Sequence, residues 1–137
     1  MVAWPSKGIT LLETLDNLNF AWSAKFYNSY IVTDETTVNV KCLQTGEEWN
    51  FDTIDKSESN YFRRDGNNST EEFKNRVIFK NETLIPQPGF VYEITIKNLT
   101  DLNTDSAVDY IYRSRFEYGM KVKKIQHQTI LQLILMG

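Results

Sequence analysis

Residues 108–118 constrain the fold most, because their side chains alternate with the two-residue period of a β-strand. One parity is mainly aromatic and consists of Val108, Tyr110, Tyr112, Ser114, Phe116 and Tyr118. The other parity is mainly charged and consists of Asp109, Ile111, Arg113, Arg115 and Glu117. The alternation predicts a long strand that buries its rings and exposes its charges.

Residues 129–136 carry apolar side chains at both parities, interrupted by Gln132. A strand of this kind needs cover on both of its faces. We therefore expect it to be either a central strand of the fold or a seam to another subunit. Its candidate interface residues are Ile130, Leu131 and Leu133.

Chain length and aromatic content indicate the fold class. A chain of 137 residues can bury an apolar core as one domain, and an aromatic content of 13% favours strands over helices. We predict an all-β fold, a single-domain antiparallel β-sandwich or small barrel of about seven or eight strands with one short N-terminal helix. Residues 1–19 would form an N-terminal arm and that helix, and residues 20–137 the β domain.

The N-terminal expectation rests on one proline and one spacing. Pro5 forces Trp4 into an extended conformation, and Trp4 is a candidate interface residue. Apolar side chains then recur at roughly helical spacing, at Ile9, Leu12, Leu15 and Leu18. This spacing predicts a helix over residues 8–19, with Thr10 as its N-cap and Glu13 completing a capping box.

Further segments alternate as strands do. They are residues 20–32 with a bend near 28–29, then residues 37–43, 48–52, 76–80 and 90–98. Gly46 lies in a turn between two of these segments, which predicts a β-hairpin with Trp49 and Phe51 facing inward. Residues 99–107 are expected to connect the last of them to residues 108–118.

Residues 53–75 lose all periodicity and are rich in polar side chains. A long loop inside a compact domain is usually functional or mobile. This one contains aromatic residues, which suggests that parts of it pack against another surface. Tyr61 and Phe62 are therefore candidate interface residues.

Catalytic and zinc-binding residue sets are not evident in the sequence. Nucleophilic catalysis needs a base beside the nucleophile, and His127 is the one histidine and Cys42 the one cysteine of the chain. A buried cysteine and a surface histidine explain both residues better than a catalytic dyad, and two such residues cannot complete a zinc site. We expect no enzymatic activity, no cofactor and no small-molecule substrate.

Calcium is the best metal hypothesis that the sequence offers. Oxygen ligands occur at the first, third, fifth and ninth positions of an EF-hand-like loop, at Asp101, Asn103, Asp105 and Asp109. Ser106 replaces the glycine of that loop, and Tyr112 replaces its glutamate. An ordinary Asp- and Asn-rich turn accounts for the same residues, and we favour it.

A basic strip runs through Arg113, Arg115, Lys121 and Lys123. Basic side chains beside aromatic rings can bind single-stranded nucleic acid, so a small-barrel nucleic-acid-binding protein is an alternative reading. The formal net charge of −3 argues against that reading. So does parity, because the rings of residues 108–118 lie on the face opposite to the two arginines.

The pattern as a whole favours a non-enzymatic structural protein that binds other protein subunits as a homo- or hetero-oligomer. Its composition suits a small virion component of a tailed phage, such as a head–tail connector, tail or capsid-accessory subunit. A second alternative is a carbohydrate-binding module that uses Trp22, Trp49 or neighbouring tyrosines as stacking platforms.

Cysteine content and the N-terminal residues bear on localisation. A single cysteine excludes an intrachain disulfide, and residues 1–20 lack the basic and apolar regions of a signal peptide. We expect an intracellular protein, or part of a virion assembled inside a cell, that has no contact with a membrane.

Overall fold

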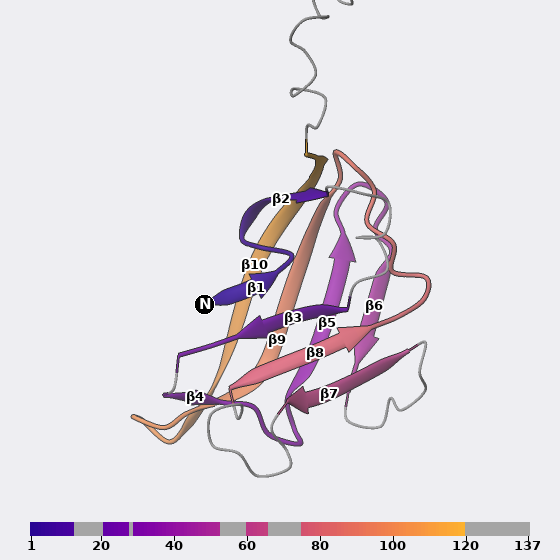
Figure 1. Cartoon of the computed structure of the whole chain (residues 1–137). Coiled ribbons are helices and arrows are strands. Elements are labelled where there is room, and N and C mark those ends of the chain that lie inside the picture. Colours follow the sequence, from indigo (N-terminus) through magenta and orange to yellow (C-terminus); the bar gives the residue numbers. More distant parts are fainter. Residues whose placement is uncertain (13–20, 28, 53–59, 66–74, 120–137) are drawn as a thin grey trace, which may run out of the picture.

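The computed structural model describes residues 1–12, 21–27, 29–52, 60–65 and 75–119, which form ten strands and no helix (Figure 1). The smaller sheet contains, in spatial order, β1 (Val2–Trp4), β3 (Trp22–Lys25), β8 (Arg76–Lys80) and β7 (Tyr61–Asp65). The larger sheet contains, in spatial order, β2 (Gly8–Leu12), β10 (Ser106–Tyr118), β9 (Val91–Asp101), β5 (Thr37–Cys42) and β6 (Glu48–Phe51). The short strand β4 (Tyr30–Ile31) also pairs with β9.

The two sheets face each other, and the strands of the smaller sheet run across those of the larger one (Figure 1). A core of apolar side chains fills the space between them, with Trp22 and Phe79 from one sheet and Tyr92 and Phe116 from the other. This arrangement confirms the predicted all-β class and fits a β-sandwich.

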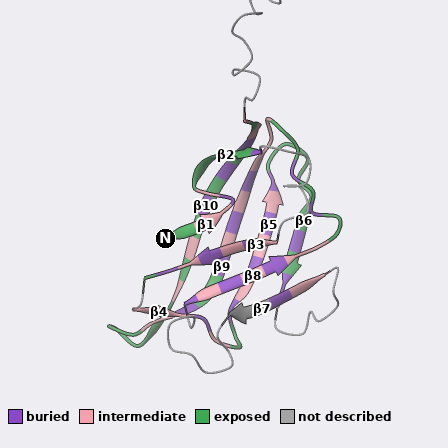
Figure 2. Cartoon of the chain, in the orientation of Figure 1, coloured by how far each residue is buried: buried purple, intermediate pink, exposed green. Residues whose placement is uncertain are grey.

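Alternation along β10 follows the prediction. Tyr112, Ser114 and Phe116 are buried, whereas Ile111, Arg113 and Arg115 are exposed (Figure 2). The hairpin of β5 and β6 is also confirmed: Gly46 has a positive φ of 79°, and Trp49 and Phe51 face the core. The predicted connection over residues 99–107 is shorter, because β9 continues to Asp101 and β10 begins at Ser106.

The predicted N-terminal helix is wrong over Gly8–Leu12, which is strand β2 and pairs in parallel with β10. Thr10 and Leu12 face the core and Ile9 and Leu11 face outward, so the apolar residues fit two strand faces instead of one helix stripe. Tertiary contacts fix this choice, because Thr10 Oγ1 lies 2.7 Å from Ser114 Oγ inside the fold. Residues 13–19 of the predicted helix lie outside the described part.

Two other expectations about strands are modified. The loop predicted over residues 53–75 contains β7, which pairs with β8 and places Phe62 in the core, only 3% exposed. The segment predicted over residues 20–32 as one bent strand is two separate strands. β3 ends at Lys25 in the smaller sheet, and β4 begins at Tyr30 in the larger one.

The N-terminal residues are part of both sheets. β1 forms one edge of the smaller sheet and β2 one edge of the larger sheet, joined through a cis Trp4–Pro5 peptide bond. The ring of Trp4 packs edge-on against Trp22 and Phe116, with centroid separations of 6.3 and 5.9 Å. The buried hydroxyl of Tyr112 donates to the carbonyl of Pro5. The N-terminal residues therefore pack against the sandwich.

Candidate functional site

One edge of β10 is only partly occupied. β9 pairs along one side of β10 from Ser106 to Arg115, whereas on the other side β2 pairs only with residues 114–118. No strand in the described part of the chain pairs with that side over residues 106–113. We call these eight residues the free edge.

The direction of the backbone groups along β10 follows from three hydrogen bonds. The N–H of Phe116 donates to Phe90 and its carbonyl accepts from Gly89, both on the β9 side. The N–H of Gly119 donates to Leu12 on the β2 side. Because backbone groups alternate along a strand, those of Ile111 and Arg113 point away from β9. Both residues thus present a donor and an acceptor at the free edge.

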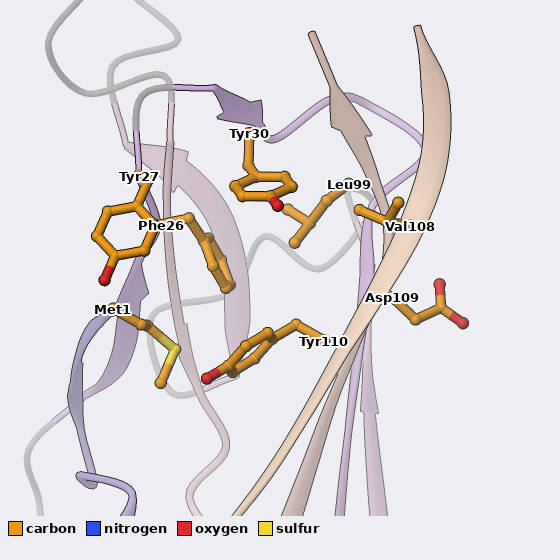
Figure 3. Close-up of a pocket in the computed structure, with 8 residues that line it drawn as sticks. All are labelled: Met1, Phe26, Tyr27, Tyr30, Leu99, Val108, Asp109 and Tyr110. Carbon is orange, nitrogen blue, oxygen red and sulfur yellow. The ribbon is translucent and has the colours of Figure 1, made fainter. Parts of the chain in front are cut away.

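An apolar cavity of about 280 Å³ lies beside the free edge. Its lining residues are Met1, Phe26, Tyr27, Tyr30, Leu99, Val108, Asp109 and Tyr110. Figure 3 shows Met1, Phe26 and Tyr27 on one side of it, facing Tyr110 from β10. The Asp109 carboxylate points away from the other labelled side chains, so the cavity is lined mainly by rings and aliphatic groups (Figure 3).

Ring packing shapes this cavity. The ring of Phe26 packs edge-on against that of Tyr110, with a centroid separation of 5.6 Å. The centroids of the Tyr110 and Tyr112 rings are 6.0 Å apart. Tyr27 is 70% exposed at its rim. A cavity with aromatic walls and an exposed rim can receive an apolar side chain.

A β-bulge opposite Asp109 positions the cavity wall. The pairing of β9 with β10 shifts register between Val108 and Tyr110, and Asn98 has a positive φ of 65°. The N–H of Asn98 donates to Asp109 Oδ1 at 3.1 Å, and Thr36 Oγ1 donates to the Asn98 carbonyl. The extra residue in β9 turns Leu99 toward the cavity.

The calcium candidates lie at the tip of this same hairpin. The Asp101 carboxylate accepts from the N–H of Asn103, and the Asp101 carbonyl accepts from the N–H of Asp105. Asp109 lies farther along, in strand β10. Within the described ranges, no three His, Cys, Asp or Glu side chains gather in a way that could hold a metal ion. The hydrogen bonds of Asp101 are those of an ordinary Asp- and Asn-rich turn.

The two described arginines of the basic strip lie exposed on the outer face of the larger sheet, and each has a carboxylate partner. Arg113 contacts Glu93 at 3.0 Å, and Arg115 contacts Glu117 at 2.9 Å. Register places Lys41 and Glu48 in the same row as Arg113 and Glu93, so charge alternates across four strands. This pattern resembles a solvated sheet face more than a phosphate-binding strip. Lys121 and Lys123 lie outside the described residues.

The predicted interface residues have different positions in the fold. Phe62 belongs to the core, so its assignment to an interface is corrected, and Trp4 packs on the core. Tyr61 is half-buried on β7. Ile130, Leu131 and Leu133 lie outside the described part.

Trp22 and Trp49 are both buried, which rules them out as exposed platforms for a sugar. The carbohydrate-binding alternative required these rings, or neighbouring tyrosines, to form an exposed row. The structure therefore removes the two tryptophans on which that alternative mainly rested.

The free edge and its cavity were not foreseen from the sequence. The one available signal was Ile111, the only apolar side chain on the outward parity of residues 109–117. Ile111 is 58% exposed, although isoleucine is usually buried. Ile9 and Leu11, which were assigned to a helix, are also exposed on the outward face of β2.

Alkaline pH is expected to destabilise the fold through two tyrosines. Burial raises the pKa of Tyr92 to about 12 and also raises that of Tyr112. Because the unfolded value is 10.0, the folded state favours the neutral phenol. The stabilisation is complete below pH 10.0 and is lost as the pH rises toward the folded value. Urea unfolding across this window should show a falling free energy of unfolding, with a shallower fall for Tyr92→Phe. Equal slopes for the two proteins would contradict the assignment to Tyr92.

The comparisons with known proteins found no counterpart. No family model matches the chain, and neither the curated proteins nor the solved structures include a match. Among the described residues, no helix has the length and apolar character needed to cross a membrane. The site itself is therefore the basis for a functional proposal.

Proposed function

We propose that this chain is a non-enzymatic assembly protein that binds another protein subunit through the free edge of β10 and the cavity beside it. The proposal rests on one observation. The backbone N–H and carbonyl groups of Ile111 and Arg113 point away from β9 at the free edge, next to an apolar cavity. An extended segment of a partner can hydrogen-bond to such an edge and insert alternate side chains into a pocket.

Exposed apolar side chains also support the assignment of the free edge and its cavity as the binding surface. Ile111 lies on the outer side of the free edge, and Tyr27 lies at the cavity rim on the inner side. An added strand would cover apolar surface on both of its faces. Soluble proteins usually blunt an unpaired edge with charges or prolines, and Ile111 interrupts the charged residues of this one.

A narrower role is proposed from composition alone. The cysteine-poor chain suits a small subunit of a tailed-phage particle, such as a head–tail connector, a tail protein or a capsid-accessory protein. Such subunits assemble inside the host cell, which agrees with the expected localisation. The free edge is a surface through which such an assembly can form.

Mass in solution tests the proposed assembly. Sedimentation of the full chain over a wide concentration range should show a defined oligomer, whose mass is a multiple of the 16.0 kDa of one chain. Association should strengthen as concentration rises. A particle of 16.0 kDa at every concentration would contradict self-assembly, and if no other protein co-purified with it, the proposed function would be contradicted as well.

A further inference from the structure

We infer that the strand that occupies the free edge is residues 129–136 of a second copy of this chain. The inference rests on the proposed function, and it names the partner and the segment that binds. Three observations support it: the match in length, the match of apolar faces and the position of β2.

Length and composition match on the two sides. The free edge spans eight residues, 106–113, and the segment 129–136 also contains eight. That segment has no charged residue and no proline, so every residue in it can donate to a sheet ladder. A strand of this length can pair along the whole free edge.

The two faces of the segment also match the two sides of the edge. A strand added beside β10 would direct alternate side chains toward the cavity, next to Val108 and Tyr110. Its other side chains would lie on the outer face next to Ile111, which is exposed. Apolar residues at both parities of 129–136 suit this position. One parity would enter the cavity, and the other would contact Ile111, which lies between Asp109 and Arg113 on the outer face.

The position of β2 favours a second copy over the same chain. The described residues end at Gly119, whose N–H donates to Leu12 at the end of β2. β2 occupies the β10 edge over residues 114–118, between Gly119 and the free edge. A segment of the same chain must pass β2 before it reaches the free edge, whereas a second copy can approach that edge directly. Each copy carries both the edge and the segment, so two copies can exchange strands and close as a symmetric pair.

Photo-crosslinking with isotope mixing tests this pairing. Full-length protein with a benzophenone amino acid at position 111 is mixed with wild-type chain labelled with heavy nitrogen, and the mixture is irradiated. We expect cross-links from position 111 to heavy peptides within residues 129–136. The same group at position 50, an exposed residue of β6 in the same sheet, serves as the control and should give none.

Each outcome separates the inference from the proposed function. Cross-links only within one chain would overturn the second-copy assignment. Cross-links to a different segment of the heavy chain would overturn the role of 129–136 and leave subunit binding intact. The full-length variant Leu131→Asp should lose the cross-link and sediment at 16.0 kDa, with an unchanged circular dichroism spectrum. An oligomer that persists in this variant, or a wild-type chain that binds only a different protein, would likewise overturn the inference alone. A wild-type chain that associates neither with itself nor with another protein would overturn the proposed function as well.

Discussion

Trp22→Ala is expected to lower the free energy of unfolding by about 3–5 kcal/mol, because it removes the largest side chain at the centre of the core. Trp22 is only 1% exposed. The centroid of its ring lies 5.6 Å from that of Phe116, 5.9 Å from that of Tyr92 and 6.0 Å from that of Phe79. These partners come from both sheets, so the substitution weakens the contact between the two layers.

Urea unfolding of the two proteins measures this loss. Trp22→Phe is the matched control, because it keeps an aromatic ring in contact with both sheets and should cost clearly less. A loss for Trp22→Ala of less than about 1 kcal/mol, well below the range for buried tryptophan, would show that Trp22 does not join the sheets as described.

Ile111→Pro is expected to abolish most of the association of subunits while the fold persists. The N–H of Ile111 points to the free edge, so proline removes a donor that the larger sheet does not use. A partner strand would lose that hydrogen bond and leave its own carbonyl unpaired. Leaving one buried polar group unpaired costs about 1–3 kcal/mol, which weakens association roughly five- to 150-fold.

Ile111→Thr separates the backbone effect from the side-chain effect. Threonine keeps the N–H and the β-branched shape but loses apolar surface, so its association should weaken much less than that of the proline variant. Sedimentation gives the association constants, and thermal unfolding checks that both variants fold. Equal association of wild type and Ile111→Pro would mean that subunits bind elsewhere.

Alternation in the sequence was sufficient to predict much of the larger sheet. Side chains of β5, β6, β9 and β10 face inward and outward with the predicted parity, because each strand has one face on the core and one in solvent. The arginines of β10 were predicted on the opposite face from its rings, and they lie there.

The N-terminal strand β2 could not be predicted in this way. Ile9 and Leu12 satisfy a helical spacing that continues at Leu15 and Leu18. A five-residue strand is too short for its alternation to compete with that pattern. The choice depends on β10, whose edge β2 pairs with, and on the hydroxyl contact between Thr10 and Ser114. These partners lie more than a hundred positions away.

The candidate site was hidden for a related reason. An edge is free when no other strand pairs with it, so finding one requires the order of the strands in the sheet. The alternation of a single segment does not encode that order. The cavity combines Met1, Phe26 and Tyr110, which come from three distant parts of the chain. The only signal in the sequence was Ile111, an apolar residue between charged ones on the outward parity of β10. The structure shows that it is exposed.

Amide hydrogen exchange at Ile111 and Arg113 tests the central claim most directly, because these two N–H groups are the ones that a partner strand would bind. We predict slow exchange in concentrated, associated protein and fast exchange on dilution. The N–H groups of Tyr110 and Tyr112 face β9, so they should stay protected throughout and serve as internal controls. Fast exchange of Ile111 and Arg113 at every concentration, in protein that is nevertheless associated, would contradict pairing at the free edge.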